Sequence, residues 1–251
     1  MAFFRLSIVV GVVAAGVATA AAGDQSHHWS YSGKNGPAHW AEIDSHNAAC
    51  AGRRQSPIAI QSSHSRAAPL PGLEFHYRPT PLRIVDNGHT IQVNMDPGNW
   101  LSVGGHRYEL IQFHFHRPSE EIIDGKRFAM VAHLVHRDAK GQLAVVAVPL
   151  NAGHDNALVE RLWRSLPAGT DKEASRPEVR INAAALLPAN LGYYAYTGSL
   201  TTPPCSEGVR WVVLKTASTV SAHEVDVFAA RYPNGARPIQ PLNGREVISS
   251  K

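Results

Sequence analysis

The stretch Gln112-Phe113-His114-Phe115-His116 decides the fold prediction, because polar and aromatic residues alternate along it. Successive side chains of a β-strand point to opposite faces of the sheet. His114 and His116 therefore project together with Gln112, and the two phenylalanines point the other way. The pattern predicts a strand that is buried on its aromatic face and carries two imidazoles on the other.

A second strand is predicted at residues 130–136, where apolar residues surround two more histidines. His133 and His136 are an odd number of residues apart, so they face opposite sides and only one can join the first pair. His136 ends the strand before the turn-like segment 137–141, which favours His133. Neighbouring strands lie roughly 4.8 Å apart and zinc–nitrogen bonds are about 2.0 to 2.1 Å long, so three imidazoles can converge on one ion and leave a fourth position for water.

The alternative is that the histidines are ordinary polar strand surface, which is the commoner fate of a His-x-His pair taken alone. The aromatic residues behind the pair argue against it, because they bury the strand. A buried imidazole needs a hydrogen-bond partner or a metal.

The N-terminus has the pattern of a secretory signal peptide. Residues 1–22 contain a single charge, Arg5, followed by an apolar run and small residues, and we expect cleavage after Ala20 or Ala22. The alternative is an uncleaved anchor, although the run is short and alanine-rich for a membrane span. The pattern predicts a periplasmic or secreted protein with no stable membrane span after cleavage.

Residues 23–251 are predicted to form one domain, since no linker or repeat divides them. A net charge of +4 without an extended basic cluster does not support a nucleic-acid-binding protein. The two cysteines, Cys50 and Cys205, favour one disulfide in an exported chain. The alternative is a pair of buried thiols.

Short strand-like runs dominate the rest of the chain. Asn87-Gly88 predicts a hairpin between two strands, with His89 at the mouth of the second. Helices are predicted at residues 156–166, capped by Asp155, and after Ser221, which with Glu224 forms a capping box. We therefore expect a mainly β (α+β) fold with a central, mostly antiparallel twisted sheet and a few short peripheral helices.

Several polar residues could have an ordinary structural role rather than a catalytic one when each is considered alone. His89 could be an exposed turn residue, and Glu120 could be loop surface charge. Thr201 and Thr202 precede Pro203-Pro204, which would suit a strand ended by prolines as well as a rigid catalytic loop.

Taken together, the motifs resemble those of the alpha-class carbonic anhydrases, in that family's order and over residues 29–245. They comprise Ser30-Tyr31, Asn35-Gly36-Pro37, His39-Trp40, Gln55-Ser56-Pro57-Ile58, Leu82-Arg83-Ile84, Asn87-Gly88-His89, Gln112 to His116, His133 to His136, Ser199 to Pro204 and Gln240-Pro241-Leu242-Asn243.

The resemblance implies a zinc enzyme that hydrates CO2 reversibly to bicarbonate and a proton. Zinc would be bound by His114, His116 and His133, with Gln112 holding a ligand imidazole from outside the ligand set. Thr201 would accept a hydrogen bond from the attacking hydroxide and pass its own proton to Glu120, and His89 would export the product proton.

The remaining roles implied by the resemblance concern substrate and water. Thr202 would orient substrate, and an apolar wall for CO2 would comprise Val135, Val145, Leu200, Val209 and Trp211. The water chain used by His89 would be held by Tyr31, Asn87 and Gln92. The Cys50–Cys205 pair matches that of secreted and bacterial relatives, and the oligomeric state is left open between monomer and homodimer.

Two positions depart from the family pattern. Val131 stands where the family usually has a glutamate that orients the third zinc histidine, and Glu121 stands where many relatives have histidine. Loss of such an orienting group typically costs ~10- to 100-fold in metal affinity or activity. The departure predicts weaker zinc retention, which Val131→Glu would improve.

Two other function classes remain as alternatives. A catalytically silent carbonic-anhydrase-like binding module would typically lack a zinc histidine, whereas this chain keeps all three. A zinc esterase could use the same hydroxide, and we expect ester hydrolysis as a side activity.

Overall fold

A computed structural model describes residues 28–251 of the chain. The predicted signal peptide, residues 1–22, lies outside the described residues. Within the described part of the chain, none of the helices has the length and apolar character needed to cross a membrane.

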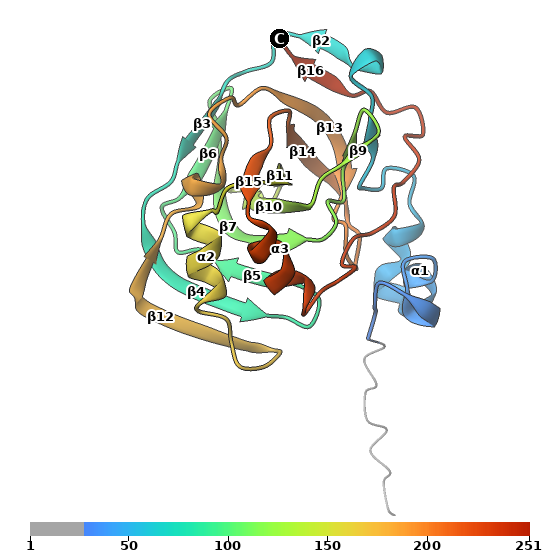
Figure 1. The fold of residues 1–251 in the computed structure, drawn as a ribbon. Helices are drawn as coiled ribbons and strands as arrows, with labels where there is room; N and C mark the ends of the chain where they lie inside the picture. Colours follow the sequence, from blue (N-terminus) through green and yellow to red (C-terminus); the bar gives the residue numbers. More distant parts are fainter. Residues whose placement is uncertain (1–27) are drawn as a thin grey trace, which may run out of the picture.

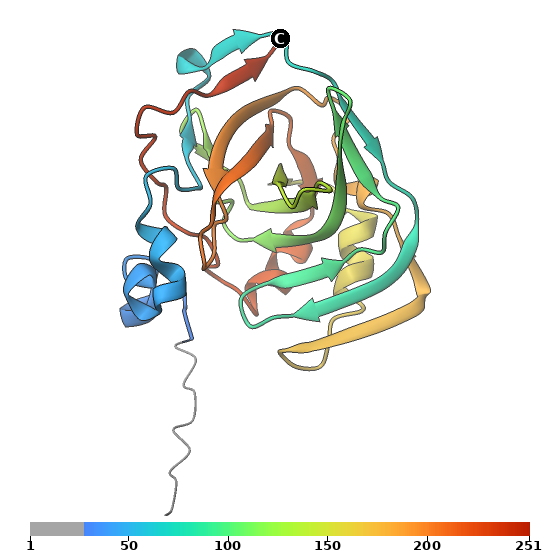
Figure 2. The same ribbon diagram turned by 180° about the vertical axis from the view of Figure 1, so that it is seen from behind.

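One large, strongly curved sheet organises residues 28–251 (Figures 1 and 2). In spatial order its main path is β12 (Lys172–Ile181), β4 (Thr80–Asp86), β5 (Ile91–Asn94), β7 (His106–His116), β10 (Met130–Arg137), β11 (Leu143–Ala152), β14 (Glu207–Leu214), β13 (Tyr193–Ser199), β16 (Ile248–Ser250) and β2 (Arg66–Ala68). The strands β3 (Leu73–His76), β6 (Trp100–Val103) and β15 (Ser218–Val220) pair beside this path. A small separate sheet contains β1 (Ala59–Ile60), β8 (Ile122–Ile123) and β9 (Lys126–Arg127).

Most neighbouring strands of the large sheet are antiparallel, which confirms the predicted fold class. Three pairings are parallel, however: β11 with β14, β11 with β15, and β16 with β2. The sheet is therefore mixed rather than purely antiparallel.

Helical segments are short and lie at the periphery. They are η1 (Gly33–Asn35), α1 (Trp40–Ile43), η2 (Ser45–Ala51), η3 (Ser62–His64), α2 (Ala157–Trp163), η4 (Ala183–Leu186) and α3 (Ala222–Ala229). The predicted capping box of Ser221 and Glu224 is present at α3. The predicted cap of α2 was wrong by one residue, because Asn156 rather than Asp155 accepts hydrogen bonds from the first backbone amides of the helix.

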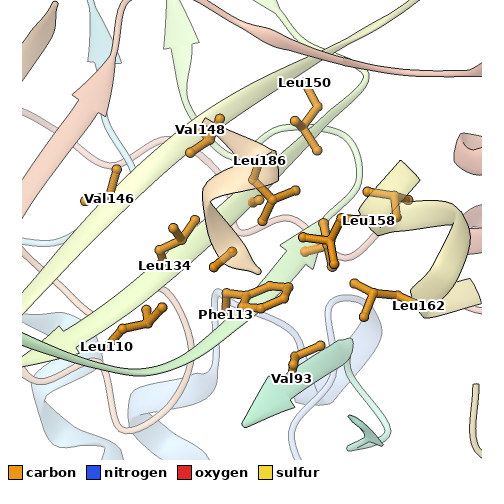
Figure 3. Packing of buried hydrophobic residues seen from close by; sticks show 14 of the residues in the cluster. Val93, Leu110, Phe113, Leu134, Val146, Val148, Leu150, Leu158, Leu162 and Leu186 are labelled. Atoms are coloured by element: carbon orange, nitrogen blue, oxygen red, sulfur yellow. The ribbon is translucent and has the colours of Figure 1, made fainter. Parts of the chain in front are cut away.

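The two faces of β7 and β10 bury different groups, as the alternation predicts. Phe113 and Phe115 point into a large apolar cluster that α2 and α3 cover. Figure 3 shows Phe113 close to Leu134 of β10 and to Leu158 and Leu162 of α2. The opposite face of these strands is therefore the one available for the histidines.

Candidate active site and metal centre

His114 and His116 of β7 and His133 of β10 form one cluster, as the sequence predicted. His114 lies directly opposite His133 in the antiparallel register of the two strands. One potential ligand nitrogen of each ring lies within 4.8 Å of the others. His136 faces the other way, where its Nε2 is 2.6 Å from the hydroxyl of Tyr77. The period of two thus selected the correct three histidines.

Each imidazole uses one ring nitrogen for a protein contact. The Nδ1 of His114 lies 2.8 Å from Oε1 of Gln112, and the Nδ1 of His116 lies 2.7 Å from the carbonyl oxygen of Gly235. The Nε2 of His133 lies 3.0 Å from Oε1 of Glu121. In each case the acceptor oxygen places the ring proton on that nitrogen and leaves the lone pair of the other nitrogen free.

The free nitrogens fit a bound zinc ion. The Nε2 of His116 is buried and has no hydrogen-bond partner among residues 28–251. Burial lowers the pKa of His114 and His133 well below the usual value and that of His116 to about 4, so all three rings are neutral at neutral pH. Neutral imidazole is the ligand form of histidine, and three histidines with an open position are a typical catalytic zinc set.

Glu120 lies beside this cluster and is fully buried. Its Oε1 accepts a hydrogen bond from the backbone amide of Arg237 at 2.8 Å, and its side chain is hydrogen-bonded to Thr201. Its Oε2 is 3.7 Å from Nε2 of His116 and 3.9 Å from Nδ1 of His133. Burial raises the pKa of Glu120 to about 8, and a cation bound by the histidines would lower it. The predicted contact between Thr201 and Glu120 is present.

Glu121, the next residue, contacts the same histidine from the other edge of its ring. The side chains of Glu121 and His133 are each 1% exposed, and the hydrogen bond between them is 3.0 Å long. Val131 alone predicted that His133 has lost its orienting carboxylate. That prediction was wrong, because a carboxylate reaches the ring from the segment between β7 and β8 rather than from β10.

The predicted apolar wall is assembled on the histidine face of the sheet. Four of its members are buried in one cluster, and Leu200 packs against that cluster; the four are Val135, Val145, Val209 and Trp211. The ring of Trp211 lies 5.0 Å from that of His133, edge to face. Thr202 is half-buried in the loop after β13, one residue from the buried Thr201.

His89 stacks on Trp29, with 3.6 Å between ring centroids and 11° between ring planes. Burial, followed by the neighbouring His28, lowers the pKa of His89 to about 4. The ring is therefore neutral at neutral pH and can accept a proton. Both His89 and Tyr31 line a cavity of about 340 Å³ together with Gly235, whose carbonyl holds His116.

Of the other three residues predicted to hold the water chain, Asn87 and Gln92 are hydrogen-bonded to neighbours and, within residues 28–251, Tyr31 is not. The side-chain oxygen of Asn87 accepts hydrogen bonds from the amides of His89 and Thr90. Gln92, which lies opposite His114 across β5 and β7, donates to Asn94 at 2.7 Å. Tyr31 presents a buried hydroxyl without a partner among the described residues.

The predicted disulfide between Cys50 and Cys205 is present, with 4.9 Å between the Cα atoms. It ties the loop that carries Thr201 to η2. Arg237 reinforces this connection, because its guanidinium donates to the carbonyl of Cys50 at 3.1 Å and to Oε1 of Gln55 at 2.7 Å. Gly235 and Arg237 were not predicted from the sequence. They contact His116 and Glu120 through a backbone carbonyl and a backbone amide, and no side-chain pattern marks such groups.

Comparison with known proteins places these features in one family. The family model that matches residues 35–251 is described as eukaryotic-type carbonic anhydrase. A carbonic anhydrase of Nostoc sp. is 41% identical over 250 residues, covering 96% of this chain and 93% of its own. One from Pectobacterium carotovorum is 43% identical over 236 residues, covering 92% and 95%. The solved alpha-carbonic anhydrase of Thermovibrio ammonificans, in complex with sulfanilamide, has a TM-score of 0.85 at 40% identity, covering 90% of this chain and 99% of that one.

Proposed function

Because the chain belongs to the alpha, or eukaryotic-type, carbonic anhydrase family, we propose that its three histidines hold a catalytic Zn²⁺ for CO2 hydration. The observation that carries this proposal is that the two nitrogens of each imidazole ring have different environments. One nitrogen of every imidazole is engaged by the protein, and the remaining nitrogens lie within 4.8 Å of one another. Zinc in such a site acidifies water to a pKa of about 7 and so supplies hydroxide at neutral pH, for which carbonic anhydrase is the reference case.

Thr201 and Glu120 act on the attacking oxygen. Glu120 is held by the amide of Arg237 and accepts the hydroxyl proton of Thr201. The Thr201 oxygen is then left with lone pairs only toward the site. With zinc bound by the three histidines, Thr201 would accept a hydrogen bond from the hydroxide that the metal supplies and would so orient it toward CO2.

The apolar wall and Thr202 act on the substrate. Val135, Val145 and Trp211 offer CO2 a surface without free hydrogen-bond donors, because the indole N–H of Trp211 donates to the carbonyl of Ser199 at 3.0 Å. Bicarbonate is charged, and this surface solvates it poorly, so the product leaves readily. The same hydroxide would hydrolyse activated esters, and we propose this as a side activity only.

His89 is the proposed proton carrier. Its ring lines the same cavity as Tyr31 and is neutral at neutral pH, so a ring nitrogen is open to the proton released at the metal. Because a pKa of about 4 makes the ring a weak proton acceptor in this conformation, the role requires a pKa closer to the usual value of about 6.5. Tyr31, Asn87 and Gln92 are the proposed polar groups along the path.

The decisive experiment is stopped-flow CO2 hydration, followed with a pH indicator, on the mature oxidised protein. Zinc is stripped with a chelator and then restored. We expect activity to disappear and return with one zinc per chain. A protein that holds stoichiometric zinc and hydrates no CO2 would contradict the proposal and favour a binding role.

We also propose that the protein is exported to the periplasm or secreted. The disulfide supports this, since such bonds persist in oxidising compartments. Mass spectrometry of the exported protein is expected to show a new N-terminus after Ala20 or Ala22, and an intact N-terminus would favour an anchor.

A further inference from the structure

The positions of Glu121 and Val131 point to an exchange of roles between the segment after β7 and strand β10. Val131 is fully buried, lies two residues before His133 on the same face, and packs in the apolar cluster with Val135 and Trp211. Glu121 reaches the ring of His133 from outside the strand. The site therefore still contains one orienting carboxylate, but it comes from a different element.

The backbone around Glu121 is fixed by neighbouring segments. Its carbonyl accepts a hydrogen bond from the hydroxyl of Ser119 at 2.9 Å, and that hydroxyl also accepts one from the amide of Phe128 at 2.9 Å. The next residue, Ile122, begins β8 and pairs with Ala59 of β1. Glu121 is thus held from both sides, which makes it a rigid support for another side chain.

Consecutive glutamates contact opposite edges of one imidazole. Oε1 of Glu121 is 3.0 Å from Nε2 of His133, whereas Oε2 of Glu120 is 3.9 Å from Nδ1 of the same ring. A carboxylate can only accept a proton from Nε2, so it keeps the Nδ1 lone pair free for a metal. Hydrogen bonding to a carboxylate also makes the imidazole a more basic ligand.

We propose that Glu121 is the positioning residue for His133, and that it replaces a carboxylate at position 131 as the group that fixes the metal-binding tautomer. The inference rests on the proposed zinc site. It reverses the expectation drawn from Val131 alone, because the exchange of the two positions preserves a carboxylate that orients His133.

Four proteins test this proposal: the wild type, Glu121→Gln, Val131→Glu, and the double variant Val131→Glu/Glu121→His, which restores the residues usual in the family. Zinc dissociation is followed with a chromophoric chelator, and the melting temperature of each metal-free protein is measured in parallel. A matched control is Glu224→Gln, since Glu224 is also a buried glutamate but accepts hydrogen bonds from the amides of Asn156, the N-cap of α2, and Ser221, the N-cap of α3.

We expect Glu121→Gln to release zinc ~10- to 100-fold faster, because its amide can also donate to Nε2 and so favours the wrong tautomer. The double variant should return zinc release to near the wild-type rate, a rescue that a purely structural role would not produce. Val131→Glu alone should not slow zinc release. It buries a second carboxylate beside Glu121, whereas the Nε2 proton of His133 is already bonded to Glu121. Glu224→Gln should lower only the melting temperature.

Wild-type zinc release in Glu121→Gln, or slower release in Val131→Glu, would overturn this inference while leaving the zinc site intact. If Glu121→Gln does not fold, the double variant decides: fast release from it would contradict the exchange. A wild-type protein that binds no zinc would overturn the proposed function and this inference together.

Discussion

At the residue scale, His89 is the proposed proton carrier between the buried site and bulk solvent. Because proton export follows the attack on CO2, its loss should slow turnover without impairing substrate capture. We expect His89→Ala to lower kcat on the order of 100-fold in weak buffer, with kcat/KM for CO2 unchanged. Concentrated imidazole buffer should restore kcat, and a kcat independent of buffer in the variant would contradict the role.

Trp29 stacks on that histidine and covers one face of its ring, so we expect it to contribute to the burial that lowers the pKa of His89. Burial is the largest cause of the lowered pKa of His89, about 4 in this conformation. Trp29→Ala exposes the ring to water, so we expect the pKa of His89 to rise toward about 6.5. NMR titration of the histidine protons measures it, and a pKa that stays near 4 would show that the indole is not responsible.

His136 predicts a pH dependence of stability. It is fully buried, and burial lowers its pKa to about 4, so the fold favours the neutral ring. Its contribution is complete above the unfolded value of about 6.5 and is lost as the pH falls toward 4. Between pH 7 and pH 5 the stabilising contribution of His136 falls by about 2 kcal/mol.

The matching variant is His136→Phe, compared with the wild type as metal-free proteins by urea unfolding at pH 7 and pH 5. From pH 7 to pH 5, the free energy of unfolding of His136→Phe should fall by about 2 kcal/mol less than that of the wild type. The unpaired hydroxyl of Tyr77 lowers stability equally at both pH values. An equal fall in both proteins would show that His136 does not titrate in this range.

At the scale of elements, the disulfide joins η2 to the loop that follows β13. The two cysteines are 155 residues apart, and closing a loop of that length restricts the unfolded chain by about 5 kcal/mol in the chain-entropy model. Replacing both with alanine should lower the free energy of unfolding by about 2 to 5 kcal/mol, measured by urea unfolding. Reduction of the wild type should match the double variant, and a loss below about 1 kcal/mol would contradict this estimate.

Strand periodicity was enough to predict the cluster of three histidines, because it is a local property of the chain. The alternation in β7 placed His114 and His116 on one face, and the odd spacing in β10 separated His133 from His136. The same reasoning could not find the role of Glu121. Its contact with His133 depends on how the segment after β7 returns to the sheet, which is set by long-range packing with β1 and β9.

At the scale of the whole molecule, zinc is expected to stabilise the fold, since it binds the native arrangement of three strand residues. At a zinc concentration ~1,000 times the dissociation constant this adds about 4 kcal/mol, or roughly 10 °C in melting temperature for a chain of this size. Calorimetry before and after chelation measures it. Added Zn²⁺ should restore the original melting temperature of the chelated protein, and Mg²⁺ should not. Identical melting curves before and after chelation would argue against metal binding at the histidines.

The composition and strand pattern also predicted the mainly β architecture, but not the parallel pairings that carry β14 and β15 beside β11. Those pairings join segments more than sixty residues apart, and nothing in the local sequence specifies them. The placement of Gly235 and Arg237 against the site is of the same kind. Side-chain patterns identified what the site is made of, and tertiary contacts decided how it is held.

The contacts of the C-terminal segment impose an order of events on biosynthesis. The carbonyl of Gly235 fixes His116 and the amide of Arg237 fixes Glu120, although both partners are synthesised more than a hundred residues earlier. Before residues 235 to 237 have emerged from the ribosome, a nascent chain therefore has all three histidines but lacks two of the groups that orient the site. If the histidines bind zinc as proposed, metal loading is accordingly a late step, completed after nearly the entire polypeptide has left the ribosome and, if the chain is exported, in the compartment where it folds.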